Sequence, residues 1–249
     1  MRDFAKGAAA PETGHDYARR QPVRSHTGRV VEDLGLAIIS GRQAEGSLLP
    51  GDAELIERFN VSRTVLREAL KTLSAKGLVR AKARIGTRVQ PRSHWNLFDP
   101  DVLVWYARIG FAPDFLIHLG EMRRALEPEA AALAALRRTQ AQLAAIREWE
   151  LKMSDPKILP QDFVHADLGF HLAIADAANN PFFLSISTLI EVALVAMLTV
   201  SSPVENSVRL AASVAGHRAI ADAIAAGDPD GARRAMQAVV QTGIDYARS

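Results

Sequence analysis

The stretch from Val61 to Leu73 carries side chains suited to contacting duplex DNA. Apolar residues recur in it every three to four positions, which predicts a short helix with one buried face. The polar side chains at its start and on its other face are Ser62, Arg63, Thr64, Arg67 and Lys71. Serine is a preferred helix N-cap, and an arginine can donate two parallel hydrogen bonds to a guanine edge. The pattern predicts a recognition helix for the DNA major groove, and the alternative is a solvated basic helix face.

Three residues farther along the chain have the types and spacing of metal ligands. Asp167 and His171 are four residues apart in a helical pattern, so a carboxylate and an imidazole share one helix face. His217 lies in a later segment whose neighbours are apolar. Together the three suit one divalent cation, zinc or similar, with open coordination positions. Taken separately, His217 can be a buried core histidine and Asp167–His171 an ordinary polar pair.

A recognition helix needs supporting helices, and the preceding residues supply them. Arg29–Ile39 has the periodicity of an amphipathic helix. Asp52 can cap a second short helix, and Asn60 closes the turn before the recognition helix. Three helices with a tight second turn are typical of a helix-turn-helix domain.

A two-stranded hairpin is predicted after the recognition helix. Gly77 suits the left-handed position that follows a helix end. Leu78–Ala83 and Thr87–Gln90 have strand patterns, with Arg84 near the tip between them. An arginine at such a tip can enter a DNA minor groove, whose negative potential attracts it. The hairpin therefore predicts a wing beside the helix-turn-helix.

The charge of the chain is divided between its two parts. Residues 1–95 hold 17 Lys and Arg against 10 Asp and Glu, a net charge of +7. Residues 96–249 hold 13 and 18, a net charge of −5, so the whole chain has +2. This asymmetry indicates a nucleic-acid partner for the first part only.

The second part is predicted to be an antiparallel all-helical bundle of six or seven helices. The candidate helices span residues 99–109, 113–136, 139–153, 160–178, 181–201, 207–226 and 229–247. The overall fold class is therefore mainly α. We expect a flexible N-terminal arm at 1–27, a winged helix-turn-helix at 28–91, a linker at 92–98 and a helical effector-binding and dimerisation domain at 99–249.

The composition of the 249 residues excludes several classes of protein. The chain has no cysteine, so it has no disulfide and no thiol chemistry, which fits a cytoplasmic location. The N-terminus lacks the apolar core of a signal peptide. The most apolar run, Phe182–Val200, is interrupted by polar residues, which favours a buried helix over a membrane span.

The order of residue types from about 29 to 90 resembles the winged helix-turn-helix of GntR-type bacterial transcription regulators. The resemblance rests on the runs Leu48–Leu55, Phe59–Leu70, Lys76–Val79 and Gly86–Val89. It implies that Arg63, Thr64, Arg67 and Arg84 contact DNA. Members often carry an arginine early in the second helix, where this chain has Ala53, so that helix is left out of the predicted contacts.

The second part resembles the FadR-type, or FCD, effector domain, through Glu121–Ala131, Asp167–His171, Asn180–Pro181 and His217–Asp228. Such domains often hold a metal through an Asp-x-x-x-His pair and two further histidines. Asp167, His171 and His217 match three of these ligands. The middle histidine has no counterpart here, and Glu191 is the nearest replacement.

Arg123 matches an arginine that lines the effector pocket in many members of that family. A guanidinium inside a helical bundle must pair with an anion, because its charge cannot be shed. The alternative is a structural salt bridge with Glu121 or Glu127. The stretch Arg92–Trp105 is similar to regulators that respond to sugar acids such as galactonate.

These features predict a homodimeric, sequence-specific DNA-binding transcription regulator rather than an enzyme. We expect a repressor that binds a double-stranded operator and is controlled by a small carboxylate effector, with no membrane partner. Two alternatives are a metal-dependent enzyme acting on a small acid and a non-specific architectural DNA binder. Turnover of an acid would favour the first, and equal affinity for operator and random DNA the second.

Overall fold

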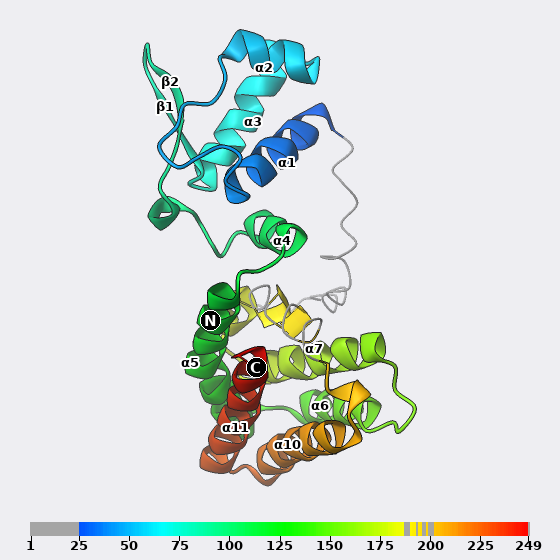
Figure 1. Ribbon diagram of the computed structural model, residues 1–249. Coiled ribbons are helices and arrows are strands. Elements are labelled where there is room, and N and C mark those ends of the chain that lie inside the picture. The colour runs from blue at the N-terminus through cyan, green and yellow to red at the C-terminus, as the bar shows by residue number, and fades with distance from the viewer. Residues whose placement is uncertain (1–24, 187–189, 193, 196–197, 199–201, 249) are drawn as a thin grey trace, which may run out of the picture. The chain divides into compact units, whose positions relative to one another are not determined.

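The computed structural model describes residues 25–186, 190–192, 194–195, 198 and 202–248. The predicted N-terminal arm, residues 1–27, therefore lies almost entirely outside the described residues. The chain divides into two compact units, Met1–Ile109 and Gly110–Ser249 (Figure 1).

The described part of the first unit contains four α-helices and a small antiparallel hairpin. Its elements are α1 (His26–Ile39), α2 (Asp52–Phe59), α3 (Arg63–Ala75), β1 (Val79–Lys82), β2 (Gly86–Val89), the 3₁₀ turn η1 (Arg92–His94) and α4 (Pro100–Ile109). Asn60 lies in the left-handed region with φ 49°, as the predicted tight turn between α2 and α3 requires. Gly77 has φ 75° after the end of α3, which confirms the predicted helix stop.

The hairpin pairs β1 with β2 in antiparallel register, from Val79 opposite Val89 to Lys82 opposite Gly86. Residues 83–85 form the loop, in which Arg84 has φ 62°. A left-handed residue in a three-residue loop lets two twisted strands join with little strain elsewhere. The predicted wing is therefore present, with an exposed Arg84 at its tip.

Helix α4, which the sequence pattern assigns to the helical domain, packs against α1 in the first unit. Trp105 of α4 lies over Gly35 of α1, where a Cβ atom would come within 2.5 Å of the indole ring. A glycine at this position is what allows the ring to approach the α1 backbone. The first compact unit therefore extends beyond the predicted boundary at residue 91.

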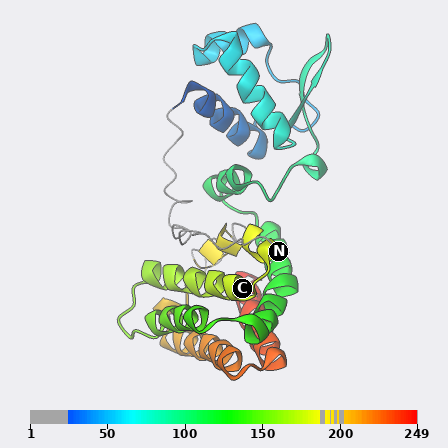
Figure 2. The same cartoon turned by 180° about the vertical axis from the view of Figure 1, so that it is seen from behind.

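The second unit consists of helices. They are α5 (Pro113–Arg137), α6 (Gln140–Met153), α7 (Pro160–Ala177), α8 (Pro181–Ser185), the 3₁₀ turn η2 (Pro203–Glu205), α10 (Ser207–Ala226) and α11 (Pro229–Arg248). Helix α5 packs along α11, and α6 contacts both α7 and α10 (Figures 1 and 2). The predicted fold class, mainly α with a wing hairpin and a helical bundle, is confirmed.

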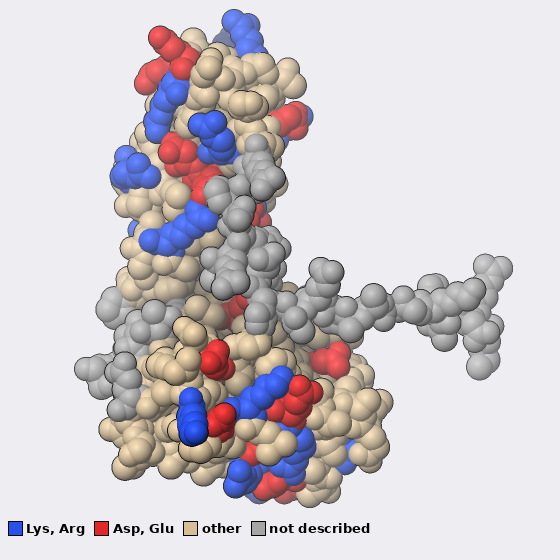
Figure 3. Space-filling view, turned by 90° about the vertical axis from the view of Figure 1, so that its right-hand side faces the viewer, with Lys and Arg blue, Asp and Glu red and all other residues tan. Residues whose placement is uncertain are grey.

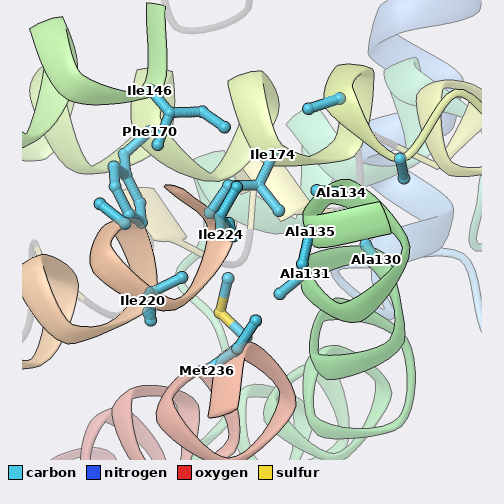
Figure 4. Packing of buried hydrophobic residues seen from close by; sticks show 14 of the residues in the cluster. Ala130, Ala131, Ala134, Ala135, Ile146, Phe170, Ile174, Ile220, Ile224 and Met236 are labelled. Carbon is cyan, nitrogen blue, oxygen red and sulfur yellow. The ribbon is translucent and has the colours of Figure 1, made fainter. Parts of the chain in front are cut away.

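The core of the second unit combines alanines with larger isoleucine, phenylalanine and methionine side chains from five helices. Ala131 and Ala134 of α5 face Ile174 of α7 and Ile220 of α10 around Met236 of α11 (Figure 4). Alanines on α5 let the neighbouring helices approach closely, and the larger side chains fill the space between them. This packing fixes the positions of α5, α7 and α10, which carry the candidate site residues Arg123, Asp167, His171 and His217.

The predicted helix 181–201 differs from the structure at its start. Helix α8 ends at Ser185, and Ile186 follows as its C-terminal cap. Residues 190–192, 194–195 and 198 are helical, and the remainder of 187–201 lies outside the described residues. None of the helices that can be described is both long enough and apolar enough to cross a membrane.

Candidate functional site

The predicted DNA-contact residues of α3 lie together on an exposed surface. Leu66, Ala69 and Leu73 are almost fully buried and hold the helix against the domain core. The side chain of Ser62 accepts a 3.3 Å hydrogen bond from the Val65 amide, which confirms its predicted capping position. All the predicted contact residues are exposed, namely Ser62, Arg63, Thr64, Arg67 and Lys71, and the acidic Glu68 is exposed beside them.

The charges on this surface are largely available to a polyanion. No ion pair within the described part of the chain involves Arg63, Arg67 or Arg84. Lys71 is different, because its ammonium lies 2.8 Å from the Glu68 carboxylate on the same helix. We therefore expect the three arginines to contribute more than Lys71 to binding a phosphate backbone or base edges.

In the helical unit, Asp167 and His171 of α7 meet His217 of α10 in one buried cluster. One ligand atom from each of the three lies within 4.8 Å of the other two. His217 Nε2 is 3.0 Å from one oxygen of Asp167, and His171 Nε2 is 3.9 Å from the other. All three side chains are at most 5% exposed. The structure thus brings together the three residues that the spacing predicted.

The surroundings of His217 favour a cation beside it. Its Nδ1 donates a hydrogen bond of 2.8 Å to the backbone carbonyl of Ser213, which leaves Nε2 directed at Asp167. A lone pair on Nε2 would face the lone pairs of the carboxylate, so a proton or a metal ion must lie between them. Burial alone would lower the pKa of His217, but the hydrogen bond and charge of Asp167 outweigh it and raise that pKa.

The residues of this cluster fit a metal by a second criterion. Asp167 Oδ2, His171 Nε2 and His217 Nε2 are buried polar atoms without a well-aligned hydrogen bond among the described residues. Without a bound cation, each of these three atoms would lose its hydration on burial and gain no hydrogen bond in return. One carboxylate oxygen and two imidazole nitrogens with open positions form a common donor set for zinc and similar divalent ions.

Behind the cluster, a buried ion pair links Arg123 and Glu127 of α5 to His171. Arg123 Nη2 donates to a Glu127 oxygen at 3.2 Å, and His171 Nδ1 lies 2.6 Å from the Glu127 carboxylate, although not well aligned with it. Burial alone would raise the pKa of Glu127, but the charges of Arg123 and His171 lower it to about 2. The salt bridge that was the alternative prediction for Arg123 is therefore present, and its partner is Glu127.

Glu191 does not replace the missing histidine. It is buried, but its carboxylate is not part of the cluster formed by Asp167, His171 and His217. Leu194 and Leu198 line that side of the site instead.

A cavity of about 260 Å³ opens beside the cluster. Arg123, Asp167, His171 and His217 contribute to its wall, so the structure brings all four predicted residues of the helical unit to one site. Its size lies just below the range of roughly 300–1,000 Å³ usual for small-molecule sites. The cavity is therefore suited to a small ligand.

Two residues of the cavity wall, Arg209 of α10 and Tyr246 of α11, are absent from the sequence-based prediction. The Arg209 guanidinium carbon lies 3.8 Å from the centroid of the Tyr246 ring. The available signal was spacing, because Arg209, Ser213 and His217 recur every four residues on one face of α10. No spacing pattern pointed to Tyr246, because its contact with Arg209 joins two helices and the two residues are far apart in the sequence.

The fold and the exposed cationic helix define a winged helix-turn-helix protein with a separate helical unit that contains a cavity. Comparison with family models gives the same division: residues 26–89 match the bacterial regulatory proteins of the gntR family, and residues 118–242 match the FCD domain. The chain belongs to the GntR family of bacterial transcription regulators and carries an FCD domain.

Relatives similar over most of their length include transcription factors of several enteric bacteria. The HTH-type transcriptional regulator YieP of Escherichia coli K12 is 36% identical over 86% of this chain and 91% of that protein. The galactonate operon transcriptional repressor of the same strain is 32% identical over 86% of this chain and 93% of that protein. The transcriptional repressor NanR of Cronobacter sakazakii is 32% identical over 92% of this chain and 88% of that protein.

Solved structures support the fold. The Listeria monocytogenes protein Lar has a TM-score of 0.61 at 20% sequence identity, covering 92% of this chain and 99% of that one. McbR/YncC of E. coli has a TM-score of 0.51 at 21% identity, covering 91% and 98%.

Proposed function

We propose that this regulator recognises its operator through Ser62, Arg63, Thr64, Arg67 and Lys71 of α3, with Arg84 of the wing. The observation that carries the proposal is the exposed arginine face of α3, opposite a fully buried apolar stripe. The N-terminal end of a recognition helix is the part that reaches base edges in a major groove. Arg84 at the tip of the wing is the cation that would enter the neighbouring minor groove.

We infer that two copies bind a two-fold operator and repress transcription. Closed two-fold dimers are the commonest soluble oligomers, and each recognition helix would then occupy one half-site. Two of the relatives named above are described as repressors, which supports the same sign of regulation here. This is a regulatory rather than a catalytic role, and it fits a cytoplasmic protein.

We propose that Asp167, His171 and His217 hold one divalent metal ion, zinc or similar. The support is the three buried donor atoms without well-aligned partners. When bound, the metal would supply a cation able to attract carboxylate oxygens. Protein purified without an affinity tag should contain about one equivalent of metal, and Asp167→Asn should lose it. Absence of metal from protein prepared without chelators would contradict the proposal.

We propose a small carboxylate, with sugar acids first in order of testing, as the effector in the cavity. Arg123 contributes a guanidinium to the cavity wall, and its ion pair with Glu127 holds it in position. The name of one relative, the galactonate operon repressor, favours the same chemical class. Release from DNA requires a coupling free energy between the two sites of about 1–3 kcal/mol, which corresponds to roughly 5–150-fold in affinity.

The test is a titration of a labelled fragment of the chain's own promoter, followed by fluorescence anisotropy at one stated salt concentration. We expect affinity well above that for a scrambled fragment, and a loss of that preference in Arg67→Ala. Arg234→Ala, at an exposed position of α11, is the matched control. Equal affinity for both fragments would instead indicate an architectural DNA binder.

A further inference from the structure

The cavity has a second cationic end, formed by Arg209 and Tyr246, in addition to the end formed by Arg123 and the Asp167 cluster. Arg209 lies near the start of α10 and Tyr246 near the end of α11. The Arg209 guanidinium carbon is 3.8 Å from the Tyr246 ring centroid, a distance typical of a cation–π contact. The ring therefore fixes the guanidinium at the wall of the cavity.

The two ends are separated along one helix. Arg209 and His217 both line the cavity and are eight residues apart on α10, which is about 12 Å of helix at 1.5 Å per residue. Part of that length is taken up by the two side chains. A ligand that touches both ends is therefore a short chain and not a single small anion.

The wall of the cavity is mainly apolar, but at its middle level each of two helices contributes one residue with a hydroxyl group. Gly216 of α10 lies against Val239 of α11, and Arg209 lies against Tyr246. These two contacts define how α10 and α11 are aligned in antiparallel. In this alignment Ser213 of α10 lies opposite Thr242 of α11, between the two contacts. Both of these residues line the cavity. Two hydroxyls at the middle level suit a ligand with hydroxyl groups along its chain.

The charges of the wall indicate the chemistry of the ligand's far end. Arg123 and Arg209 each place a permanent positive charge in the wall of the cavity, one near each end. Glu127 lies behind Arg123 and is paired with it. A ligand with one carboxylate would use only the end at Arg123, whereas a second anionic group would meet Arg209.

We infer that the effector carries two anionic groups, one at each end of a short hydroxylated chain, and that Arg209 is the residue that selects for the second. This inference rests on the proposed function of the cavity as an effector site and adds the class of ligand. The second group can be a carboxylate or a phosphate, since a guanidinium binds both in the same bidentate manner.

The experiment is isothermal titration calorimetry of the full chain with three six-carbon probes: galactonate with one carboxylate, galactarate with two, and phosphogluconate with a carboxylate and a phosphate. We expect galactarate or phosphogluconate to bind at least about tenfold more tightly than galactonate, the size of one added charged hydrogen-bond pair. Which of the two binds more tightly identifies the second group.

The variant Arg209→Gln should remove this preference and leave galactonate affinity within about threefold, because Arg123 is untouched. Arg234→Gln, an exposed arginine of α11 outside the cavity, should keep the preference. Tyr246→Leu should weaken the preference, and Tyr246→Phe should retain it, since only the ring is needed for the cation–π contact. If Arg209→Gln does not fold, the two Tyr246 variants still test whether the cation–π contact supports the preference for dianionic ligands.

Three results would overturn the inference. The first is galactonate binding as tightly as both dianionic probes, which leaves the effector proposal intact and refutes the selection. The second is an equal loss of all three ligands in Arg209→Gln. The third is no binding of any acid, which refutes the effector proposal as well.

Discussion

The two units use arginine in opposite ways. In the first unit, Arg63, Arg67 and Arg84 are exposed and form no ion pair with another described residue. In the second unit, Arg123 is 4% exposed and bound to Glu127. On the face of the helical unit seen in Figure 3, basic and acidic side chains lie next to one another. In the same unit, Arg233 and Glu129 form a surface ion pair with 2.6 Å between nitrogen and oxygen.

This difference separates two kinds of anion recognition. An exposed arginine keeps its hydration until a polyanion arrives, and many such contacts add up over a DNA backbone. A buried arginine has already lost its hydration, so its position must be fixed by a neighbouring carboxylate, and it can then select one small ligand. We therefore expect substitutions in the helical unit to affect stability first, and substitutions on α3 to affect DNA affinity first.

The largest expected effect on stability is that of Glu127→Gln. It leaves the Arg123 charge buried without its carboxylate, and breaking such a pair costs about 3–5 kcal/mol of unfolding free energy. Glu129→Gln is the control on the same helix, because its ion pair with Arg233 is exposed and should contribute much less to stability. Denaturant unfolding followed by far-UV circular dichroism measures both. Similar losses in the two variants would remove the distinction between buried and exposed pairs.

A smaller effect is expected from Lys76→Met, at the C-terminal cap of α3. The Lys76 ammonium lies 2.7 Å from Asp99 and 2.8 Å from Asp101, at the start of α4. Losing these partly buried charged hydrogen bonds should cost about 1.5–3 kcal/mol. The unfolding of the first unit can be followed through Trp95 and Trp105 in a Trp149→Phe background.

Lys71→Met is the matched control, since the Lys71–Glu68 pair is exposed and should contribute little to stability. Were Lys76→Met no more destabilising than Lys71→Met, the first unit would not depend on the link between α3 and α4.

The smallest effect is that of Ser62→Ala, which removes the N-cap of α3. We expect a loss of about 0.5–2 kcal/mol in the unfolding free energy of the first unit. Ser74→Ala, exposed near the other end of the same helix, should change it by no more than about 0.5 kcal/mol. Equal losses of unfolding free energy in Ser62→Ala and Ser74→Ala would show that the Ser62 cap does not stabilise the start of α3.

Local features were predictable from the sequence and distant ones were not. Ser62, Asn60 and Gly77 mark the ends of helices through their own backbone preferences, so the winged domain followed from single positions. The convergence of Asp167 and His171 followed from helical spacing. The approach of Trp105 to Gly35 and of Arg209 to Tyr246 depends on how separate helices pack, and no local pattern encodes it.

The role of Glu127 illustrates the same limit. The sequence offered both Glu121 and Glu127 as partners of Arg123, and only the structure shows that Glu127 also reaches His171. Likewise, the sequence assigned residues 99–109 to the helical domain, whereas the helix packs on α1. Both differences concern contacts between elements and not the elements themselves.

The most direct test of the account is operator affinity measured with and without the acid that binds most tightly, in wild type, Arg67→Ala and His217→Gln. We predict that Arg67→Ala loses about 1–3 kcal/mol of operator affinity and keeps acid binding, whereas His217→Gln keeps operator affinity and loses release by the acid. Unchanged operator affinity in Arg67→Ala would contradict the central claim that α3 contacts the operator.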